Sequence, residues 1–145
     1  MIIAIPQLNY KAGDIQGNSE KIISAIQKAQ NQKAELILFP ELAVSGALPQ
    51  DLLEREEFVN ACRMAVEKIA ATCTQIAAIV GAPNLDSENG IMYNSAYFIQ
   101  NGEVVDGVHK NILSDYDIFS ESRYFIAGED NTCLLYTSPS PRDPK

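Results

Sequence analysis

Two charged side chains follow apolar runs of the kind that form buried strands. Glu41 comes after the run Glu35–Phe39, which Pro40 cannot extend as a strand. Lys110 comes directly after the run Glu103–His109. In open α/β sheets, functional groups gather just beyond the carboxyl ends of the strands, where a carboxylate and an ammonium group could serve acid–base or charge-stabilising chemistry. Either residue could equally be an exposed loop side chain, and no nucleophile accompanies them.

The three cysteines do not form a recognisable reactive or metal-binding pattern. None are spaced as C-x-x-C, and Cys62 and Cys73 lie eleven residues apart, close to three helical turns. We expect both to be small apolar core residues in a reducing compartment. The only histidine, His109, has no partner at metal-ligand spacing, so the sequence predicts no metal site.

Length and composition are those of one soluble domain at most. The chain has 145 residues, of which 46% are apolar and 21% are charged. A formal charge of −8, without a basic run, argues against a nucleic-acid partner, because phosphate binding needs a surplus of Lys and Arg. No apolar stretch approaches the ~20 residues that span a bilayer, and the start does not resemble a secretory signal. We therefore expect a cytoplasmic protein with no membrane partner.

The order of apolar patterns predicts an α/β fold. Strands alternate with helices of 3.6-residue period, and an antiparallel pair follows, joined by Asn101-Gly102, a strong hairpin signal. Helices between strands imply crossovers packed on one face of a sheet, with the hairpin as a mixed edge. We expect Asn18 to cap the first helix and Phe58 to lie on the apolar face of the second. The expected strands are residues 1–8, 35–39, 75–81, 91–100 and 103–110, and the expected helices are residues 18–32 and 54–72.

The last thirteen residues differ from the rest of the chain. Cys133–Lys145 holds three of the seven prolines and has neither a helical nor a strand period. A flexible linker would have such a composition. However, CLLYTSPSPRD is also the peptide obtained by translating a common transposase-type sequencing adapter in one frame. We expect residues 1–132 to be one partial domain and residues 133–145 to be a non-native tail.

Five segments, in order, resemble the nitrilase superfamily of carbon–nitrogen hydrolases. Within it they are similar to the N-terminal glutaminase domain of glutamine-dependent NAD synthetases, and the last segment is the most specific of the five. The resemblance implies an α-β-β-α sandwich, of which this chain would supply the N-terminal half only. The segments are LNYKAGDIQGN at Leu8–Asn18, LILFPELAVSG at Leu36–Gly46, PQDLL at Pro49–Leu53, YNSAYFI at Tyr93–Ile99 and HKNILSDYDIFSESRYF at His109–Phe125.

Chemistry in this family rests on a Glu–Lys–Cys triad. By resemblance, Glu41 would be the general base that activates a thiol, and Lys110 the cation that stabilises the oxyanion. Tyr116 matches a tyrosine that contacts the glutamine substrate. Glu121 could be a second acidic residue near the triad or a structural partner of Arg123.

The chain departs from the family pattern at three points. None of its three cysteines lies in the context of the family's nucleophile, so this fragment is expected to lack glutaminase activity. Ala47 stands where tyrosine is usual, which would alter the wall of the glutamine pocket, and Ser114 stands where proline is common.

The resemblance also implies the activity and partners of the parent protein. Glutamine hydrolysis would supply ammonia for the ATP-dependent amination of deamido-NAD to NAD. ATP and Mg would belong to a fused synthetase domain, and this fragment would need no cofactor. The parent would be a homo-oligomer. The alternatives are a stand-alone amidase of the same superfamily and a non-enzymatic fragment.

Overall fold

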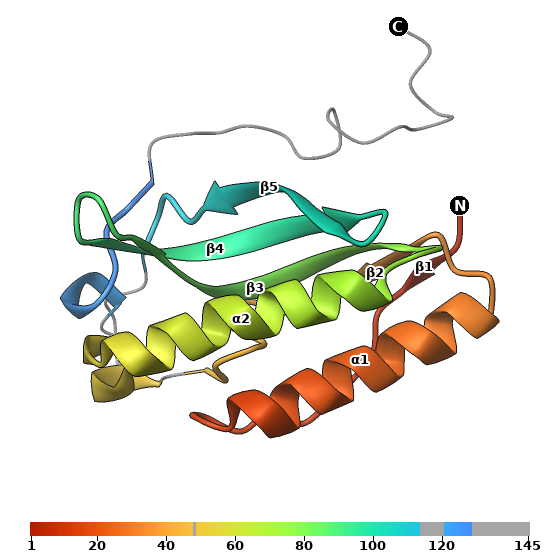
Figure 1. Ribbon diagram of the computed structural model, residues 1–145, viewed down its shortest axis with the longest axis horizontal. Coiled ribbons are helices and arrows are strands. Elements are labelled where there is room, and N and C mark those ends of the chain that lie inside the picture. The colour runs from red at the N-terminus through yellow and green to blue at the C-terminus, as the bar shows by residue number, and fades with distance from the viewer. Residues whose placement is uncertain (48, 114–120, 129–145) are drawn as a thin grey trace, which may run out of the picture.

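The computed structural model describes residues 1–47, 49–113 and 121–128. They form a five-stranded sheet in the order β1-β2-β3-β4-β5, with both long helices, α1 and α2, on the same face (Figure 1). The expected tail at residues 133–145 lies outside the described residues, as do Tyr116 and Ser114. The elements are β1 (Ile3–Ala4), α1 (Ile15–Asn31), β2 (Leu36–Leu38), η1 (Gln50–Glu54), α2 (Glu56–Thr72), β3 (Ala77–Asp86), β4 (Ile91–Gln100), β5 (Glu103–His109) and η2 (Glu121–Arg123).

The sheet is parallel on one side and antiparallel on the other. The strands β1, β2 and β3 pair in parallel through the two helical crossovers, and β3, β4 and β5 form an antiparallel meander. The β4–β5 turn has φ of 55° at Asn101 and 79° at Gly102, the left-handed pair that a two-residue hairpin turn requires. The predicted order of elements and the single helical face are confirmed.

Two strand boundaries were wrong. The first strand is only the two residues of β1, at the edge of the sheet, instead of residues 1–8. The third continues past Gly81 to Asp86, because it pairs with β4 from Ala78 to Asp86. Pro83 is tolerated inside it because β2 pairs with β3 only as far as Ile79, so no ladder hydrogen bond is needed on that side.

The first helix begins earlier than the pattern predicted. Its N-cap is Asp14, whose side chain accepts a hydrogen bond from the Gly17 amide at 3.0 Å. Asn18 lies inside the first turn and is fully buried. Its side-chain nitrogen donates to the carbonyl oxygens of Lys11 (2.8 Å) and Val44 (3.1 Å). The expected cap therefore ties the loop before α1 to the loop after β2.

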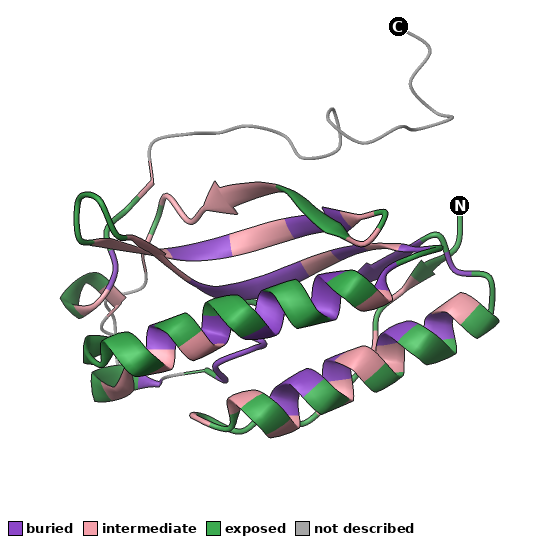
Figure 2. Ribbon diagram, viewed as in Figure 1, coloured by how far each residue is buried: buried purple, intermediate pink, exposed green. Residues whose placement is uncertain are grey.

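The core lies between the helices and one face of the sheet, where buried residues of both layers meet (Figure 2). On α2, Val59 is buried, whereas the expected Phe58 is half-buried and packs against the core. On β3 and β4, side chains alternate between the two faces of the sheet. The residues of these two strands that join the helical core are Ala78, Val80, Ala82 and Ile99.

Both helical-region cysteines are core residues, as expected. Cys62 and Cys73 are fully buried, and burial raises the pKa of the Cys62 thiol to about 12 and that of Cys73 to about 11. At pH 8 the thiolate fraction of each is therefore on the order of a thousandth or less. Among the described residues no group of three His, Cys, Asp or Glu side chains could hold a metal, and none of their helices is long and apolar enough to cross a membrane.

This burial predicts that the two thiols resist modification. In a Cys133→Ser variant, where only Cys62 and Cys73 remain, we expect DTNB at pH 8 to react at least ~1000-fold more slowly with the native protein than with protein in 6 M guanidinium (about two to three decades of thiolate fraction plus loss of access). The absorbance of released thionitrobenzoate measures both rates. Rapid reaction of one thiol in the native protein would show that its place in the core is wrong.

Candidate functional site

Glu41 is placed by a turn that lies directly on β3. The turn follows β2, and its backbone is held to β3 by the amide of Phe39, which donates to the Ile79 carbonyl (2.9 Å). Further along, the Val44 amide donates to the Gly81 carbonyl (3.2 Å). A Cβ atom on Gly81 would lie 2.6 Å from the Pro40 oxygen. The turn can approach β3 only because residue 81 has no side chain.

Lys110 is placed by the end of β5. Its backbone amide donates to the Asn94 carbonyl on β4 at 2.7 Å, which continues the strand pairing by one residue. His109, just before it, stacks on Tyr93 with ring centroids 3.9 Å apart and lies 2.7 Å from the Ser95 hydroxyl through Nδ1. These contacts fix the direction in which the chain leaves the sheet, and hence the base of the Lys110 side chain.

Four side chains meet beyond these strand ends. Lys110 Nζ donates to Glu41 Oε1 at 2.8 Å and to Glu121 Oε1 at 2.7 Å. The side-chain nitrogen of Asn94 donates to Glu41 Oε1 at 2.8 Å and to Glu121 Oε2 at 3.0 Å. We call Glu41, Asn94, Lys110 and Glu121 the carboxylate–lysine cluster. In it, one ammonium group and one amide each bridge the same two carboxylates.

The charges in the cluster keep the lysine protonated. Partial burial of Lys110 by itself would lower its pKa. The hydrogen bonds and negative charges of Glu121 and Glu41 outweigh this effect, so the pKa is raised above its ordinary value. Lys110 is 27% exposed, Glu121 10% and Glu41 51%, so Glu41 is the carboxylate most open to an incoming molecule.

A hollow of about 300 Å³ adjoins the cluster. Three of the four cluster residues line it, and its walls are mostly apolar. The alternation of β3, β4 and β5 places the wall residues Ile79, Ala96 and Val108 on the face of the sheet that α1 and α2 do not cover. A small apolar hollow with a few convergent polar groups is typical of a small-molecule site. The full lining is Phe39, Pro40, Glu41, Ile79, Gly81, Asn94, Ser95, Ala96, Val108, His109 and Lys110.

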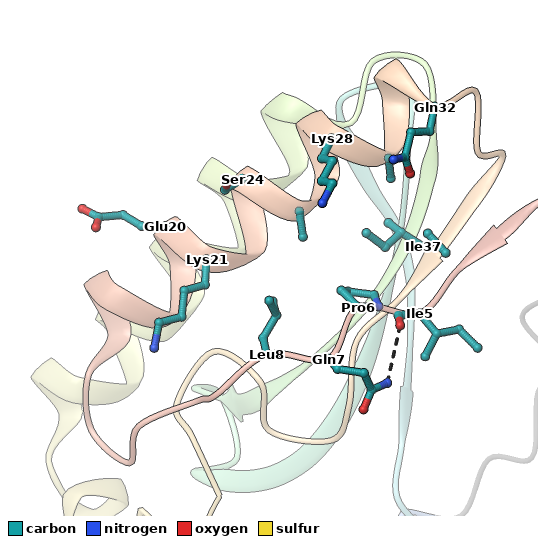
Figure 3. A pocket seen from close by; sticks show the side chains of 13 residues that line it. Ile5, Pro6, Gln7, Leu8, Glu20, Lys21, Ser24, Lys28, Gln32 and Ile37 are labelled. Carbon is teal, nitrogen blue, oxygen red and sulfur yellow. Dashed lines mark hydrogen bonds between the residues drawn. The ribbon is translucent and has the colours of Figure 1, made fainter.

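A larger hollow, of about 760 Å³, lies between α1 and the segment after β1 (Figure 3). None of the four cluster residues lines it. Its charged side chains do not converge on one point, and the Lys21 ammonium is already bonded to the Asn9 carbonyl oxygen (2.5 Å). We therefore place the candidate functional site at the carboxylate–lysine cluster.

The structure brings Glu41 and Lys110, 69 residues apart in the chain, into direct contact. Their catalytic roles stay predictions. Glu121, for which the sequence left two roles open, bonds Lys110 and Asn94. Tyr116 lies outside the described residues. Sequence reasoning missed Asn94, although a polar residue inside the apolar strand YNSAYFI was a signal that it has a buried partner.

Neither Cys62 nor Cys73 lines the hollow beside the cluster. Both belong to the core on the helical side of the sheet, whereas the hollow lies on the other side. Their raised pKa values also make them poor nucleophiles. Within the described residues, the cluster is therefore not accompanied by a reactive thiol.

Comparison with protein families gives a match over nearly the whole chain. The family model described as carbon-nitrogen hydrolase matches residues 2–136. A glutamine-dependent NAD(+) synthetase from Xylella fastidiosa is 40% identical over 124 residues, covering 85% of this chain and 22% of the relative. A protein of the same name from Aquifex aeolicus is 36% identical over 130 residues, covering 88% and 22%. The chain thus spans less than a quarter of the length of these two relatives.

Solved structures of similar proteins share the fold. A glutamine-dependent NAD(+) synthetase from Cytophaga hutchinsonii matches with a TM-score of 0.83 and 29% identity, over 90% of this chain and 22% of that one. An amidase from Nesterenkonia sp. matches with a TM-score of 0.74 and 29% identity, over 88% of this chain and 48% of the amidase. These matches confirm the expected α/β class and the nitrilase-type architecture, of which the chain holds the N-terminal part.

Proposed function

Because the chain belongs to the carbon–nitrogen hydrolase family, we propose that the carboxylate–lysine cluster is part of a site that hydrolyses the side-chain amide of glutamine. In the parent protein, the released ammonia would serve the ATP-dependent amination of deamido-NAD to NAD. The contact of Lys110 Nζ with both Glu41 and Glu121 beside the hollow carries the proposal. This arrangement brings a carboxylate that can act as a base and a fixed cation to one place. These are two of the three groups that the reaction needs, and the third is a cysteine thiol.

Each group has a separate role in the proposed reaction. Glu41 takes the proton of a cysteine thiol, and the thiolate attacks the amide carbon of glutamine. The ammonium group of Lys110 stabilises the negative oxygen of the tetrahedral intermediate. The proton on Glu41 passes to the leaving nitrogen, and ammonia departs from a thioester. Water, deprotonated by Glu41, then hydrolyses the thioester to glutamate and the free thiol.

Other parts of the parent activity lie beyond these residues. The nucleophilic cysteine would be supplied by sequence that this chain does not contain. We propose that Tyr116 contacts the glutamine substrate. We propose that ATP and Mg are bound by a synthetase domain of the parent protein. We propose a homo-oligomeric parent in the cytoplasm.

A stand-alone amidase is the second candidate. The similarity to the Nesterenkonia amidase, of which this chain covers 48%, favours it. The motif His109–Phe125 and the two synthetase relatives described above favour the first candidate. A stand-alone amidase would end with its hydrolase domain, whereas a synthetase would continue into a phosphate-binding domain.

A chimera tests the proposed function. Residues 1–132 of this chain replace the matching segment of the Xylella fastidiosa relative, which supplies the rest of the protein. We expect NAD synthesis from deamido-NAD, ATP and glutamine to be retained. The Glu41→Gln variant should lose it by about 100-fold to 10,000-fold, because the amide cannot accept the thiol proton. NADH formation in a coupled dehydrogenase assay measures both rates.

Ammonium chloride in place of glutamine is the control for folding. With ammonium the Glu41→Gln chimera should match its parent, because the base acts only on glutamine. The 145-residue chain alone should release no ammonia from glutamine. The proposal would be contradicted if the chimera without further substitution made NAD from ammonium but not from glutamine. Full glutamine-dependent activity in the Glu41→Gln chimera would contradict it as well.

A further inference from the structure

We infer that Asn94 is a positioning residue that orients the Glu41 carboxylate, so that its Oε2 atom is the proton acceptor of the proposed reaction. The inference rests on the proposed function, since it divides the work of the two carboxylates in that site. It is carried by an asymmetry in how the cluster uses its four carboxylate oxygens.

Asn94 is built into the sheet and contacts every charged member of the cluster. It is 2% exposed and lies on β4, between β3 and β5. Its side-chain nitrogen has two N–H donors and makes two hydrogen bonds, to Glu41 Oε1 (2.8 Å) and Glu121 Oε2 (3.0 Å). Its backbone oxygen accepts from the Lys110 amide (2.7 Å). One rigidly held residue therefore sets the positions of both carboxylates and of the lysine backbone.

The two oxygens of Glu41 are in different environments. Oε1 accepts from both Asn94 and Lys110, whereas Oε2 has no hydrogen-bond partner among the described residues. Two donors, one of them charged, hold electron density on Oε1 and make it the weaker proton acceptor. Oε2 is left as the more basic oxygen on a side chain that is half exposed.

Glu121 is held differently. Its Oε1 accepts from Lys110 and its Oε2 accepts from Asn94, so a donor occupies each oxygen. Hydrogen bonds to both oxygens favour the charged form and fix its orientation. The geometry thus assigns Glu121 to holding Lys110 in place, and Glu41 to the exchange of protons.

An amide suits this position better than a charged donor. A second ammonium group would neutralise the remaining negative charge and make Glu41 a weaker base. An aspartate would bring a third carboxylate to the same ammonium group and no N–H donor. Asn94 orients two carboxylates without changing the net charge of the cluster.

Nuclear magnetic resonance of the 145-residue chain tests the assignment without any substrate. As the carboxylates titrate, both side-chain N–H signals of Asn94 should shift with pH. In Glu41→Gln only one of the two signals should still shift over that range, and in Glu121→Gln only the other. The side-chain signals of Asn84, on β3, are the internal control and should not follow these titrations.

The Asn94→Ala variant gives the second measurement. Loss of the hydrogen bond from Asn94 to Oε1 should shift the carboxyl-carbon signal of Glu41 at a fixed pH, and Asn84→Ala should leave that signal unchanged. If the amide spectrum shows that Asn94→Ala does not fold, the titrations of the Asn94 signals in the wild-type, Glu41→Gln and Glu121→Gln chains still test the assignment. The assignment would be overturned if the side-chain N–H signals of Asn94 did not shift as the carboxylates titrate. The proposed function could still hold in that case, because the chimera assay measures it separately.

Discussion

Replacing Lys110 by methionine is expected to lower the glutamine-dependent activity of the chimera by about a thousandfold or more. Methionine fills a similar volume but removes the ammonium group that would stabilise the oxyanion. It also leaves Glu41 and Glu121, each bonded to Lys110 Nζ at 2.7–2.8 Å, without a cation between them. Without that cation the two carboxylates repel each other, so Glu41 would also lose the orientation in which Lys110 and Asn94 hold it.

Controls separate this effect from a general loss of structure. Ammonium-dependent NAD synthesis should be unchanged in the Lys110→Met chimera, and Lys68→Met, at an exposed position on α2, should leave both activities unchanged. Because the pKa of Lys110 is raised above 10.5, its charge is present at lower pH and is lost only as pH rises through that higher value. Titration of Lys110 should therefore not limit activity below about pH 10. Substantial glutamine-dependent activity in Lys110→Met would rule out its role as the stabilising cation.

Replacing Gly81 by alanine is expected to destabilise the chain by about 2–3 kcal/mol, the cost of forcing a buried clash to relax. The added Cβ would lie 2.6 Å from both the Pro40 oxygen and the Leu42 nitrogen, and 2.8 Å from the Glu41 Cα. These are backbone atoms, so the turn itself must move. Urea unfolding of the 145-residue chain measures the change, and displacement of Glu41 should also weaken its bond to Lys110.

Gly107 is a matched control for Gly81. It lies on β5 of the same sheet, and an added Cβ would be 3.6 Å from its nearest neighbour, on the Tyr97 ring, which is ordinary contact. Gly107→Ala should be neutral or stabilising by about 0.5 kcal/mol, since alanine loses less chain entropy on folding. Equal unfolding free energies for the two variants would show that the turn carrying Glu41 does not depend on Gly81.

Sequence patterns between neighbouring residues predicted the features of the fold that short-range interactions determine. The hairpin turn at Asn101-Gly102 and the order of helices and strands follow from nearby residues, and the structure agrees. The length of β3 depended on its pairing with β4, which continues from Ala78 to Asp86. Asn18 has the residue type of a helix cap, but the burial of its position gave its side chain different partners.

The site was predictable only in part for the same reason. Glu41 and Lys110 follow strand ends, which is a local signal, and the family resemblance assigned their roles. The contacts of Asn94 with Glu41 and Glu121 join residues 53 and 27 positions apart. No periodicity in the sequence encodes such a contact. Only the register of β3 on β4, together with the turn on Gly81, brings those side chains to one point.

The unequal lengths of the strand pairings also determine which part of the sheet unfolds locally most easily. The β1–β2 and β2–β3 pairs are two and three residues long, whereas β3 and β4 pair over nine positions. Amide hydrogens of β1 and β2 will therefore exchange with solvent through local fluctuations, and those of the β3–β4 hairpin only through more global unfolding. Glu41 follows the weakly paired strand, whereas Asn94 and Lys110 belong to the hairpin side. The cluster spans this boundary, so its bonds to Glu41 add to the backbone bonds from Phe39 and Val44 to β3 in joining the less protected part of the sheet to the more protected one.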